Sequence, residues 1–263
     1  MDERVQKVLS RWGIAARRQV EQLIQQGRVE IDGTVAYLGQ KVDPAAVQIS
    51  VDGAVVNPVE CPERIYLLMN KPRNVISTCD DPQGRRTVLA LLPLTLYQGQ
   101  GIHPVGRLDA ESTGALLLTN DGNLTFYLTH PRHHISKTYH VWVEGYPSPY
   151  ALKQWQQGVL LEGQRTLPAN ISILKSHSDH RTLLEIVLKE GRNRQIRRIA
   201  EQLGHPVQTL HRTAIGSIRL QSATQPRLES GCYRPLTNFE IGFLKSQIDL
   251  TSKKLSVDEE CRA

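Results

Sequence analysis

The chain has 263 residues, with 32 lysines and arginines against 26 acidic residues, which gives a formal net charge of +6. The apolar fraction of 40% and the charged fraction of 22% are those of a globular protein and exclude wholesale disorder. No apolar run approaches the ~20 residues of a membrane-spanning helix, and the first residues do not resemble a secretory signal. The 4 cysteines are far apart and form no CxxC pair, so neither a zinc site nor a disulfide framework is indicated. A cytoplasmic protein with no membrane association is therefore expected.

The first sixty residues predict a small domain of two helices followed by short strands. Apolar residues recur at helical spacing over Val5–Trp12 and over Val20–Ile24, and Gly13 and Gly27 are placed to end these helices. The period then changes to two, and Asp32-Gly33 is a tight-turn signal between strands. Proline-containing pairs around residues 57–62 predict a linker.

From residue 65 onward, predicted strands and helices alternate without a regular βαβ rhythm. Strands are expected at IYLLMN, ALLLTND, YHVWVEG and TLLEIVL, and helices at 88–92, from residue 123, and at 194–203. Several strands with few crossover helices predict an α+β fold with a mainly antiparallel mixed sheet flanked by helices. The expected organisation is a small first domain at 1–60, a larger second domain at 61–245 and a polar tail at 246–263.

One candidate for chemistry is the segment HPVGRLDAESTGALLLTNDG. Its Asp109 is expected where a strand ends, followed by a loop over Ala110–Gly114. A carboxylate held at a strand end suits a nucleophile or a general base. The alternative is an aspartate that only hydrogen-bonds the backbone of its own turn. The nearby pair Asp121-Gly122 is interpreted as a turn.

A second candidate is the basic segment between Lys189 and Arg212. Arg194, Arg197 and Arg198 lie at three- and four-residue spacings on a predicted amphipathic helix. One arginine turned toward the sheet can pair with a buried carboxylate while the others meet phosphates, although a solvated helix face remains the default interpretation for any single one of them.

A third cluster, the histidines of HPRHH at 130–134, has no matching acidic or cysteine set. These histidines are therefore expected on a loop that faces the partner of the protein, and no metal site is predicted.

Basic residues also gather on the first two predicted helices, where they can form a phosphate-contacting face or a solvated surface. The segment LSRWGIAARRQVEQLIQQGRVEIDG resembles the RNA-binding domain shared with small-subunit ribosomal protein four, the S4 domain. The resemblance implies a face for structured RNA led by Arg17, Arg18 and Arg28.

Four strings in order, YLLMNKPRNVIST, VGRLDAESTGALLLTNDG, KTYHVWVEG and EGRNRQIRRIAEQLGH, resemble the RsuA/RluB-type family of ribosomal RNA pseudouridine synthases. The resemblance covers most of residues 65–220. One departure is Asn74, which stands where the family usually has glycine; asparagine tolerates a positive φ better than most residues.

The resemblance implies roles for individual residues. Asp109 would be the catalytic carboxylate, Tyr139 would stack on the target uracil, and Arg197 would orient Asp109. Leu188 would form an apolar wall of the uracil pocket, and Arg107 would fill the gap left by a flipped base. Lys71 is a candidate for a phosphate contact, or it only marks the end of a strand. Further RNA contacts are expected from Arg194 and Arg198 in the basic segment between Lys189 and Arg212.

The implied reaction breaks the N1–C1′ bond of uridine and joins C5 to C1′, and it needs no redox cofactor and no metal. Asp109 can attack C1′, attack C6 of the uracil, or act as a base at C2′. The implied partner is ribosomal RNA or a pre-ribosomal particle, and the protein is expected to be a monomer. Large-subunit RNA is the preferred target. The alternatives are small-subunit RNA, an inactive ribosome-assembly factor on the same scaffold, and a hydrolase that uses Asp109.

Overall fold

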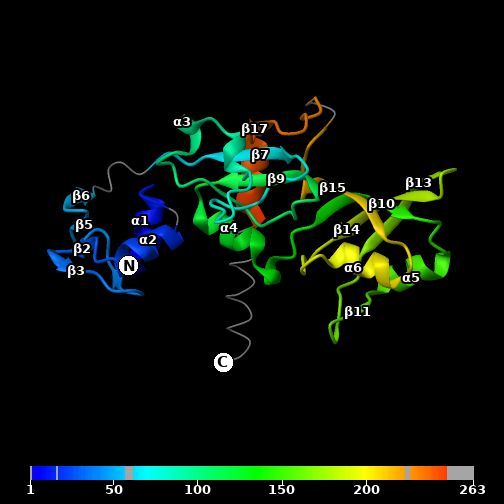
Figure 1. The fold of residues 1–263 in the computed structure, drawn as a ribbon, viewed down its shortest axis with the longest axis horizontal. Helices are drawn as coiled ribbons and strands as arrows, with labels where there is room; N and C mark the ends of the chain where they lie inside the picture. The colour runs from blue at the N-terminus through cyan, green and yellow to red at the C-terminus, as the bar shows by residue number, and fades with distance from the viewer. Residues whose placement is uncertain (1, 16, 57–61, 223–225, 248–263) are drawn as a thin grey trace.

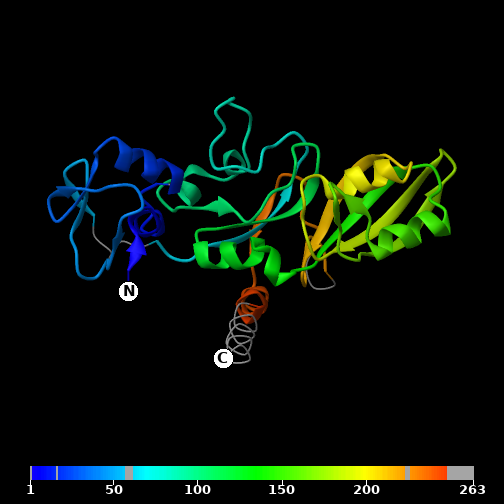
Figure 2. The ribbon, with the colours of Figure 1, turned by 90° about the horizontal axis from the view of Figure 1, so that it is seen from below.

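The computed structural model describes residues 2–15, 17–56, 62–222 and 226–247. The molecule is elongated (Figures 1 and 2), with the N-terminal unit at one end. A central body and a third part carrying two helices follow along the long axis. Among the described helices, none is long and apolar enough to cross a membrane.

The N-terminal unit has two helices packed on short strands, as the sequence predicts. The elements are β1 (Glu3–Arg4), α1 (Val5–Arg11), α2 (Arg17–Gln25), β2 (Val29–Ile31), β3 (Thr34–Val35), β4 (Lys41–Val42), β5 (Ile49–Val51) and β6 (Ala54–Val56). The strands form a four-stranded sheet in the order β3-β2-β5-β6, and β1 pairs with β4. At the predicted turn, Asp32 and Gly33 have φ of 50° and 78°. Positive φ at both positions matches the twist of a hairpin, so the turn signal is confirmed.

The rest of the chain builds one large mixed sheet. Its strands are β7 (Tyr66–Lys71), β8 (His103–Pro104), β9 (Thr113–Thr119), β10 (Lys137–Glu144), β13 (Asn170–His177), β14 (Arg181–Leu188), β15 (Val207–Ile215), β16 (Ile218–Arg219) and β17 (Tyr233–Pro235). The main order is β13-β14-β10-β15-β9-β7-β17, with β8 on β9 and β16 on β15. Among the described strands of this sheet, the β15–β9 pair is parallel and the other pairs are antiparallel. The α+β fold with a mainly antiparallel sheet is confirmed.

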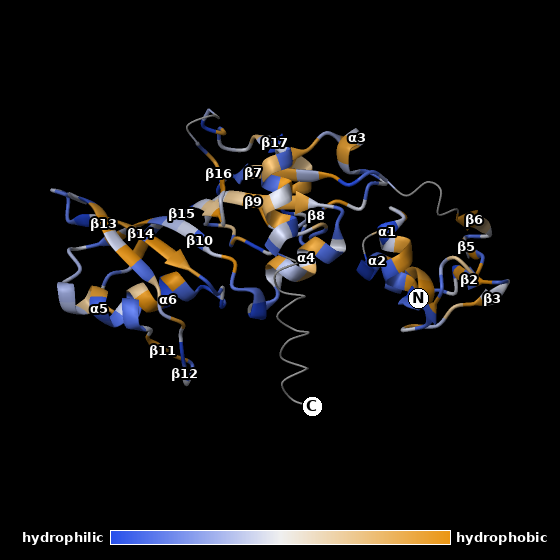
Figure 3. Cartoon of the chain, turned by 180° about the vertical axis from the view of Figure 1, so that it is seen from behind, coloured by the Kyte–Doolittle hydropathy of each residue, from blue (hydrophilic) through white to orange (hydrophobic). Residues whose placement is uncertain are grey.

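Helices and a short hairpin cover this sheet. They are the 3-10 turn η2 (Leu89–Leu91), α3 (Leu94–Tyr97), α4 (Gly122–Thr129), the 3-10 turn η3 (Pro131–His133), α5 (Pro149–Gln157), β11 (Leu160–Leu161), β12 (Gln164–Arg165), α6 (Gln195–Gln202) and a helix over 238–247. Helices α5 and α6 pack near β10 and β14, whereas α4 lies by β9 (Figure 1). Hydrophobic residues follow β9 and β14 (Figure 3), consistent with strands buried in separate cores at the two ends of the sheet.

The parallel pair β15–β9 joins the two halves of the sheet. His211 pairs with Thr113, and Arg212 pairs with Gly114. Gly114 has φ of 108°, and a Cβ placed on it would lie against the backbone of Arg212. The two strands can approach this closely because glycine has no side chain.

The segment 88–92, expected as one helix closed by Pro93, has a different structure. Only a 3-10 turn forms there, and Pro93 is the residue before α3, with φ of −58°. Proline suits a helix start because the first N–H groups of a helix have no intrahelical partner.

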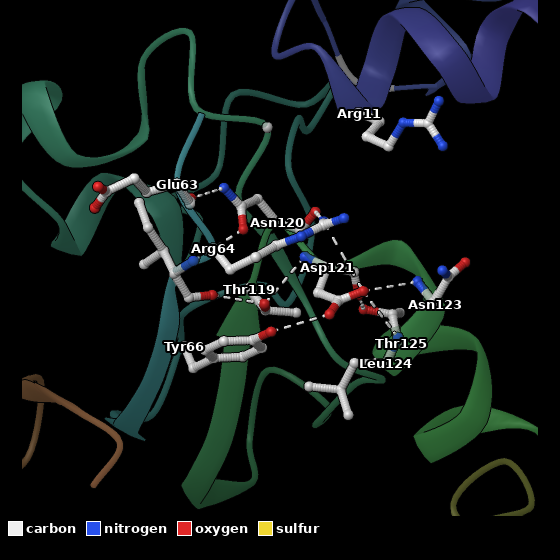
Figure 4. A network of polar contacts seen from close by, with 12 residues as sticks. Arg11, Glu63, Arg64, Tyr66, Thr119, Asn120, Asp121, Asn123, Leu124 and Thr125 are labelled. Carbon is white, nitrogen blue, oxygen red and sulfur yellow. Dashed lines mark hydrogen bonds and ion pairs between the residues drawn. The ribbon is translucent and has the colours of Figure 1, made fainter. Parts of the chain in front are cut away.

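Asp121, expected in a turn, is instead the N-cap of α4. Its Oδ1 accepts hydrogen bonds from the backbone N–H groups of Asn123 and Leu124. Its other oxygen accepts from the Tyr66 hydroxyl at 3.0 Å, and Arg64 lies beside it (Figure 4). Burial and Asp121 raise the pKa of Tyr66 to about 12, so the phenol remains a donor. The same carboxylate therefore caps a helix and ties the start of β7 to the end of β9.

The helix over 238–247 begins with a capping box. Thr237 Oγ1 accepts from the N–H of Glu240, and Glu240 Oε2 accepts from the N–H of Thr237. Arg234 adds two hydrogen bonds to the same carboxylate, at 2.8 and 2.7 Å. Ser246 and Gln247, expected in the tail, still belong to this helix. The rest of the expected tail, 248–263, and linker residues 57–61 lie outside the described residues.

Replacing Glu240 with glutamine should lower the free energy of unfolding by about 1–2 kcal/mol at pH 7, because the cap and the paired Arg234 lose their charge partner. Burial raises the pKa of Glu240, but the hydrogen bonds from Arg234 and Thr237 outweigh it and leave the pKa below its ordinary value. The stabilisation is therefore present above about pH 4.5, the ordinary pKa of glutamate, and is lost as pH falls through the folded pKa. Urea denaturation of both proteins at pH 7 and pH 3.5 should show the difference shrinking at acid pH. An equal difference at both pH values would contradict this.

Candidate active site

Asp109 lies in a loop between β8 and β9, not at a strand end, because β8 stops at Pro104 and Gly106 turns the chain with φ of 73°. The backbone closes the turn, with Ser112 N–H donating to the Asp109 carbonyl at 3.0 Å. The Asp109 side chain is 40% exposed and remains open to a ligand. The turn therefore does not depend on the carboxylate, which is free for chemistry.

The segment after β7 fixes the Asp109 loop by hydrogen bonds to its backbone. Ser77 Oγ donates to the Leu108 carbonyl at 2.9 Å and accepts from the Leu108 N–H at 3.2 Å. Asn74 N–H donates to the Ala110 carbonyl at 2.7 Å, and Asn74 has φ of 63°. Asn74 thus adopts a positive φ, which asparagine tolerates. These hydrogen bonds fix the backbone on both sides of Asp109.

Lys71 is fully buried, and this placement corrects the expected phosphate contact. Its Nζ donates to the carbonyls of Pro72 at 2.9 Å and Ser112 at 2.8 Å, and lies 3.4 Å from the carbonyl of Ala110. Burial lowers the pKa of Lys71 to about 8. The charge of Asp109 acts against this shift, and the charge of Arg212 adds to it. Because its ammonium group binds the loop from inside, Lys71 can position Asp109 but cannot reach an RNA phosphate.

The basic residue beside Asp109 is Arg194. Its Nη1 lies 3.6 Å from Asp109 Oδ2, and its Nη2 lies 3.6 Å from Glu111. Arg194 precedes α6 in the left-handed region, with φ of 49°, and this conformation turns it toward the loop. The sequence had placed Arg194 among the RNA contacts.

Arg197, expected to orient Asp109, lies one helical turn further along α6 and contacts other residues. Its Nη1 is 3.8 Å from Glu111, and its Nη2 donates to Ser112 Oγ at 3.3 Å. Burial lowers the pKa of Arg197, while Glu111 and, more weakly, Asp109 act in the opposite direction. Arg197 therefore supports the loop and adds positive potential near Asp109.

Tyr139 and Leu188 belong to the same part of the core. Both are buried, at 8% and 3% exposure, and share one apolar cluster with Leu108, the neighbour of Asp109. Tyr139 is on β10 and Leu188 ends the adjacent strand β14. Arg107, on the other side of Leu108, is exposed. Tyr139 and Leu188 thus share a cluster with the residue before Asp109, and Arg107 is exposed on the same loop.

The remaining predicted RNA contacts differ in their surroundings. Arg17 and Arg18 are exposed at the start of α2. Arg28 makes two hydrogen bonds to Asp52, both 2.6 Å long, so its charge is partly neutralised. Arg198 pairs with Glu162 at 2.8 Å.

Three residues that shape the site were not predicted: Ser77, Glu111 and Arg212. Ser77 and Glu111 stand inside the quoted motif strings, so position within a motif was an available signal. Arg212 is buried and its Nε donates to the Ala115 carbonyl at 2.6 Å. Within a basic stretch of sequence, a buried arginine looks the same as a solvated one, so no local signal could identify it.

Comparison with known families identifies the fold and its chemistry. A model described as RNA pseudouridylate synthase matches residues 65–202, and an S4 domain model matches residues 3–47. The chain belongs to the RNA pseudouridylate synthase family. The sequence-based prediction of this family is confirmed, and with it the activity of an isomerase that converts uridine to pseudouridine.

Individual relatives cover nearly the whole chain. Ribosomal large subunit pseudouridine synthase B of Bacillus subtilis is 39% identical over 94% of this chain and 97% of its own length. The protein of the same name from Salmonella typhi is 34% identical over 100% of this chain and 90% of its own. The crystal structure of a pseudouridylate synthase aligns with a TM-score of 0.64 at 31% identity, covering 92% of this chain and 99% of that one.

Proposed function

We propose that this pseudouridine synthase modifies a uridine of large-subunit ribosomal RNA, with Asp109 as its catalytic carboxylate. The observation that carries the assignment of Asp109 is its geometry: a half-exposed carboxylate on a loop fixed by Ser77 and Lys71, with Arg194 at 3.6 Å. The relatives named as large-subunit enzymes support the choice of RNA.

Each neighbour of Asp109 has a task that matches its chemistry. Tyr139 stacks on the uracil, and Leu188 closes the apolar side of its pocket. Arg107 replaces the extruded base in the RNA stack, which offsets part of the unstacking cost of about a few kcal/mol. Arg194 and Arg197 stabilise negative charge at Asp109 and at developing oxyanions. During the reaction the N1–C1′ bond breaks, C5 bonds to C1′, the C5 proton leaves and N1 gains a proton.

Arginines on two parts of the chain provide the RNA contacts. On the S4 domain, Arg17 and Arg18 bind phosphates of the ribosomal RNA or of a pre-ribosomal particle. Arg28 does the same once its ion pair with Asp52 opens. Arg198 adds a contact from α6. The proposed domains are residues 1–60 for RNA docking and 61–245 for catalysis. The working form is a cytoplasmic monomer without metal or cofactor.

The test is to incubate the purified chain separately with transcribed large-subunit and small-subunit ribosomal RNA and to map pseudouridines by carbodiimide-dependent primer-extension stops. We expect one site in the large-subunit RNA. Modification of the small-subunit RNA alone would contradict the proposed target RNA but would still demonstrate pseudouridine synthase activity. Tight binding without product on either RNA, or on pre-ribosomal particles from cells lacking the gene, would favour an inactive assembly factor.

A further inference from the structure

Four rings form a closed cluster where α4 meets η3. Phe126 lies 5.1 Å from His130, His130 lies 5.4 Å from His133, and His133 lies 5.0 Å from Tyr127. Phe126 and Tyr127 close the cluster at 5.8 Å. These centroid distances are those of interacting aromatic pairs. The four residues are called the ring cluster below.

The ring cluster is held rigidly but remains open to solvent. Leu124 and Leu128 bury one face of α4, and Ile135 anchors the chain after η3 in the same core. In contrast, Phe126 is 57% exposed. A pre-ordered aromatic surface of this kind loses little conformational entropy when a flat ligand binds to it.

The charges around the ring cluster favour an anionic partner. Arg132 and His134 are exposed beside the rings. Burial lowers the pKa of His133, and His130, His134 and Arg132 lower it further, so its ring is neutral and can stack without losing charge hydration. Aromatic rings beside an arginine are the combination that binds unpaired nucleic-acid bases and their phosphates.

The ring cluster lies next to the site of chemistry. A Cβ on Gly106 would be 3.6 Å from the Thr129 side chain, so the C-terminal end of α4 lies close to the residue before Arg107. After η3, the chain enters β10, which carries Tyr139. RNA with its target uridine at Asp109 would therefore pass the ring cluster.

We propose that the ring cluster is a second RNA-binding site, on which an unpaired base next to the target uridine stacks. The inference rests on the proposed function, because it takes ribosomal RNA as the ligand. Stacking requires a base free of pairing, so the site selects a target whose flank is single-stranded. It thereby adds specificity that the uracil pocket alone does not provide.

The experiment uses the full chain and an RNA stem-loop containing the mapped uridine, with its flanking bases either unpaired or closed into a duplex. The variants Phe126→Leu and His130→Ala should weaken Kd for the unpaired RNA by about 5- to 100-fold, the range for loss of one base stack. The single-turnover rate at saturating RNA should remain within about twofold, because neither residue touches the reacting atoms.

Two matched variants separate stacking from packing and from general surface effects. Phe126→Trp keeps a flat ring and should retain affinity, and its fluorescence should be quenched by the unpaired RNA beyond the quenching seen in the wild type. Tyr150→Ala removes a 71% exposed ring from α5, at the far end of the molecule, and should change nothing. Thermal midpoints of all variants monitor folding.

The proposal is overturned if Phe126→Leu and His130→Ala bind the unpaired RNA as tightly as the wild type, or if the wild type binds both RNAs equally. It is also overturned if Phe126→Leu and Phe126→Trp lose affinity to the same extent. These results differ from failure of the proposed function, in which the wild type makes no pseudouridine on ribosomal RNA.

Discussion

Replacing Asp109 with asparagine should lower the single-turnover rate of pseudouridine formation by about 10⁴-fold or more, the scale of loss when a reacting group is removed from an enzyme. Asparagine has nearly the same shape, and the hydrogen bonds between the Ser77 and Lys71 side chains and the loop backbone do not involve the carboxylate. The loop should therefore keep its conformation. The Kd for ribosomal RNA should change by less than about threefold, because most binding energy comes from phosphate contacts elsewhere.

Glu111→Gln is the matched control for this prediction. Glu111 lies two residues from Asp109, contacts both Arg194 and Arg197, and is 51% exposed. Its loss removes a charge near the same arginines without removing the proposed reacting group, so the rate should fall by less than about tenfold. Product formation by Asp109→Asn at more than about one per cent of the wild-type rate, or an equal loss in Glu111→Gln, would refute the assignment of Asp109.

Replacing Gly114 with alanine should destabilise the catalytic domain by about 3–5 kcal/mol, among the largest effects of a single substitution. Gly114 has φ of 108°, which an L side chain rarely adopts. Its new Cβ would also overlap the carbonyl oxygen, nitrogen and carbonyl carbon of Arg212, all of them backbone atoms. The strands could separate only by breaking the parallel pair that joins the two halves of the sheet. Guanidinium denaturation followed by tryptophan fluorescence would measure the loss.

Gly33→Ala is the control for Gly114→Ala, because it introduces the backbone strain of a positive φ without a steric clash. Gly33 also has a positive φ, of 78°, but a Cβ there would meet nothing within 4 Å. Only strain remains, with an expected cost of about 1 kcal/mol. If Gly114→Ala cost no more than Gly33→Ala, the close approach of β15 to β9 would not be what requires glycine at position 114.

The comparison of sequence and structure shows where local signals suffice. The Asp32-Gly33 turn, the glycines after α1 and α2, and the alternation along β10 and β14 act through local backbone preferences and burial, so they could be predicted. Pro93 and Asp121 were misplaced because proline and aspartate serve turns and helix starts equally, and which one forms depends on the next packed element.

The sequence by itself determined the family, the α+β class and the candidate carboxylate, because ordered motifs and hydrophobic periodicity are properties of the chain read locally. Only the tertiary structure decided which arginine meets Asp109 and which cation is buried. Arg194 and Arg197 lie one turn apart on the same helix, and the left-handed backbone before α6 selects Arg194. Lys71 and Arg212 look like surface charges in the sequence, yet the sheet encloses both beneath the loop. The net charge of +6 could not reveal this, because the effect of a charge depends on its burial and its partners, which form only when distant strands meet.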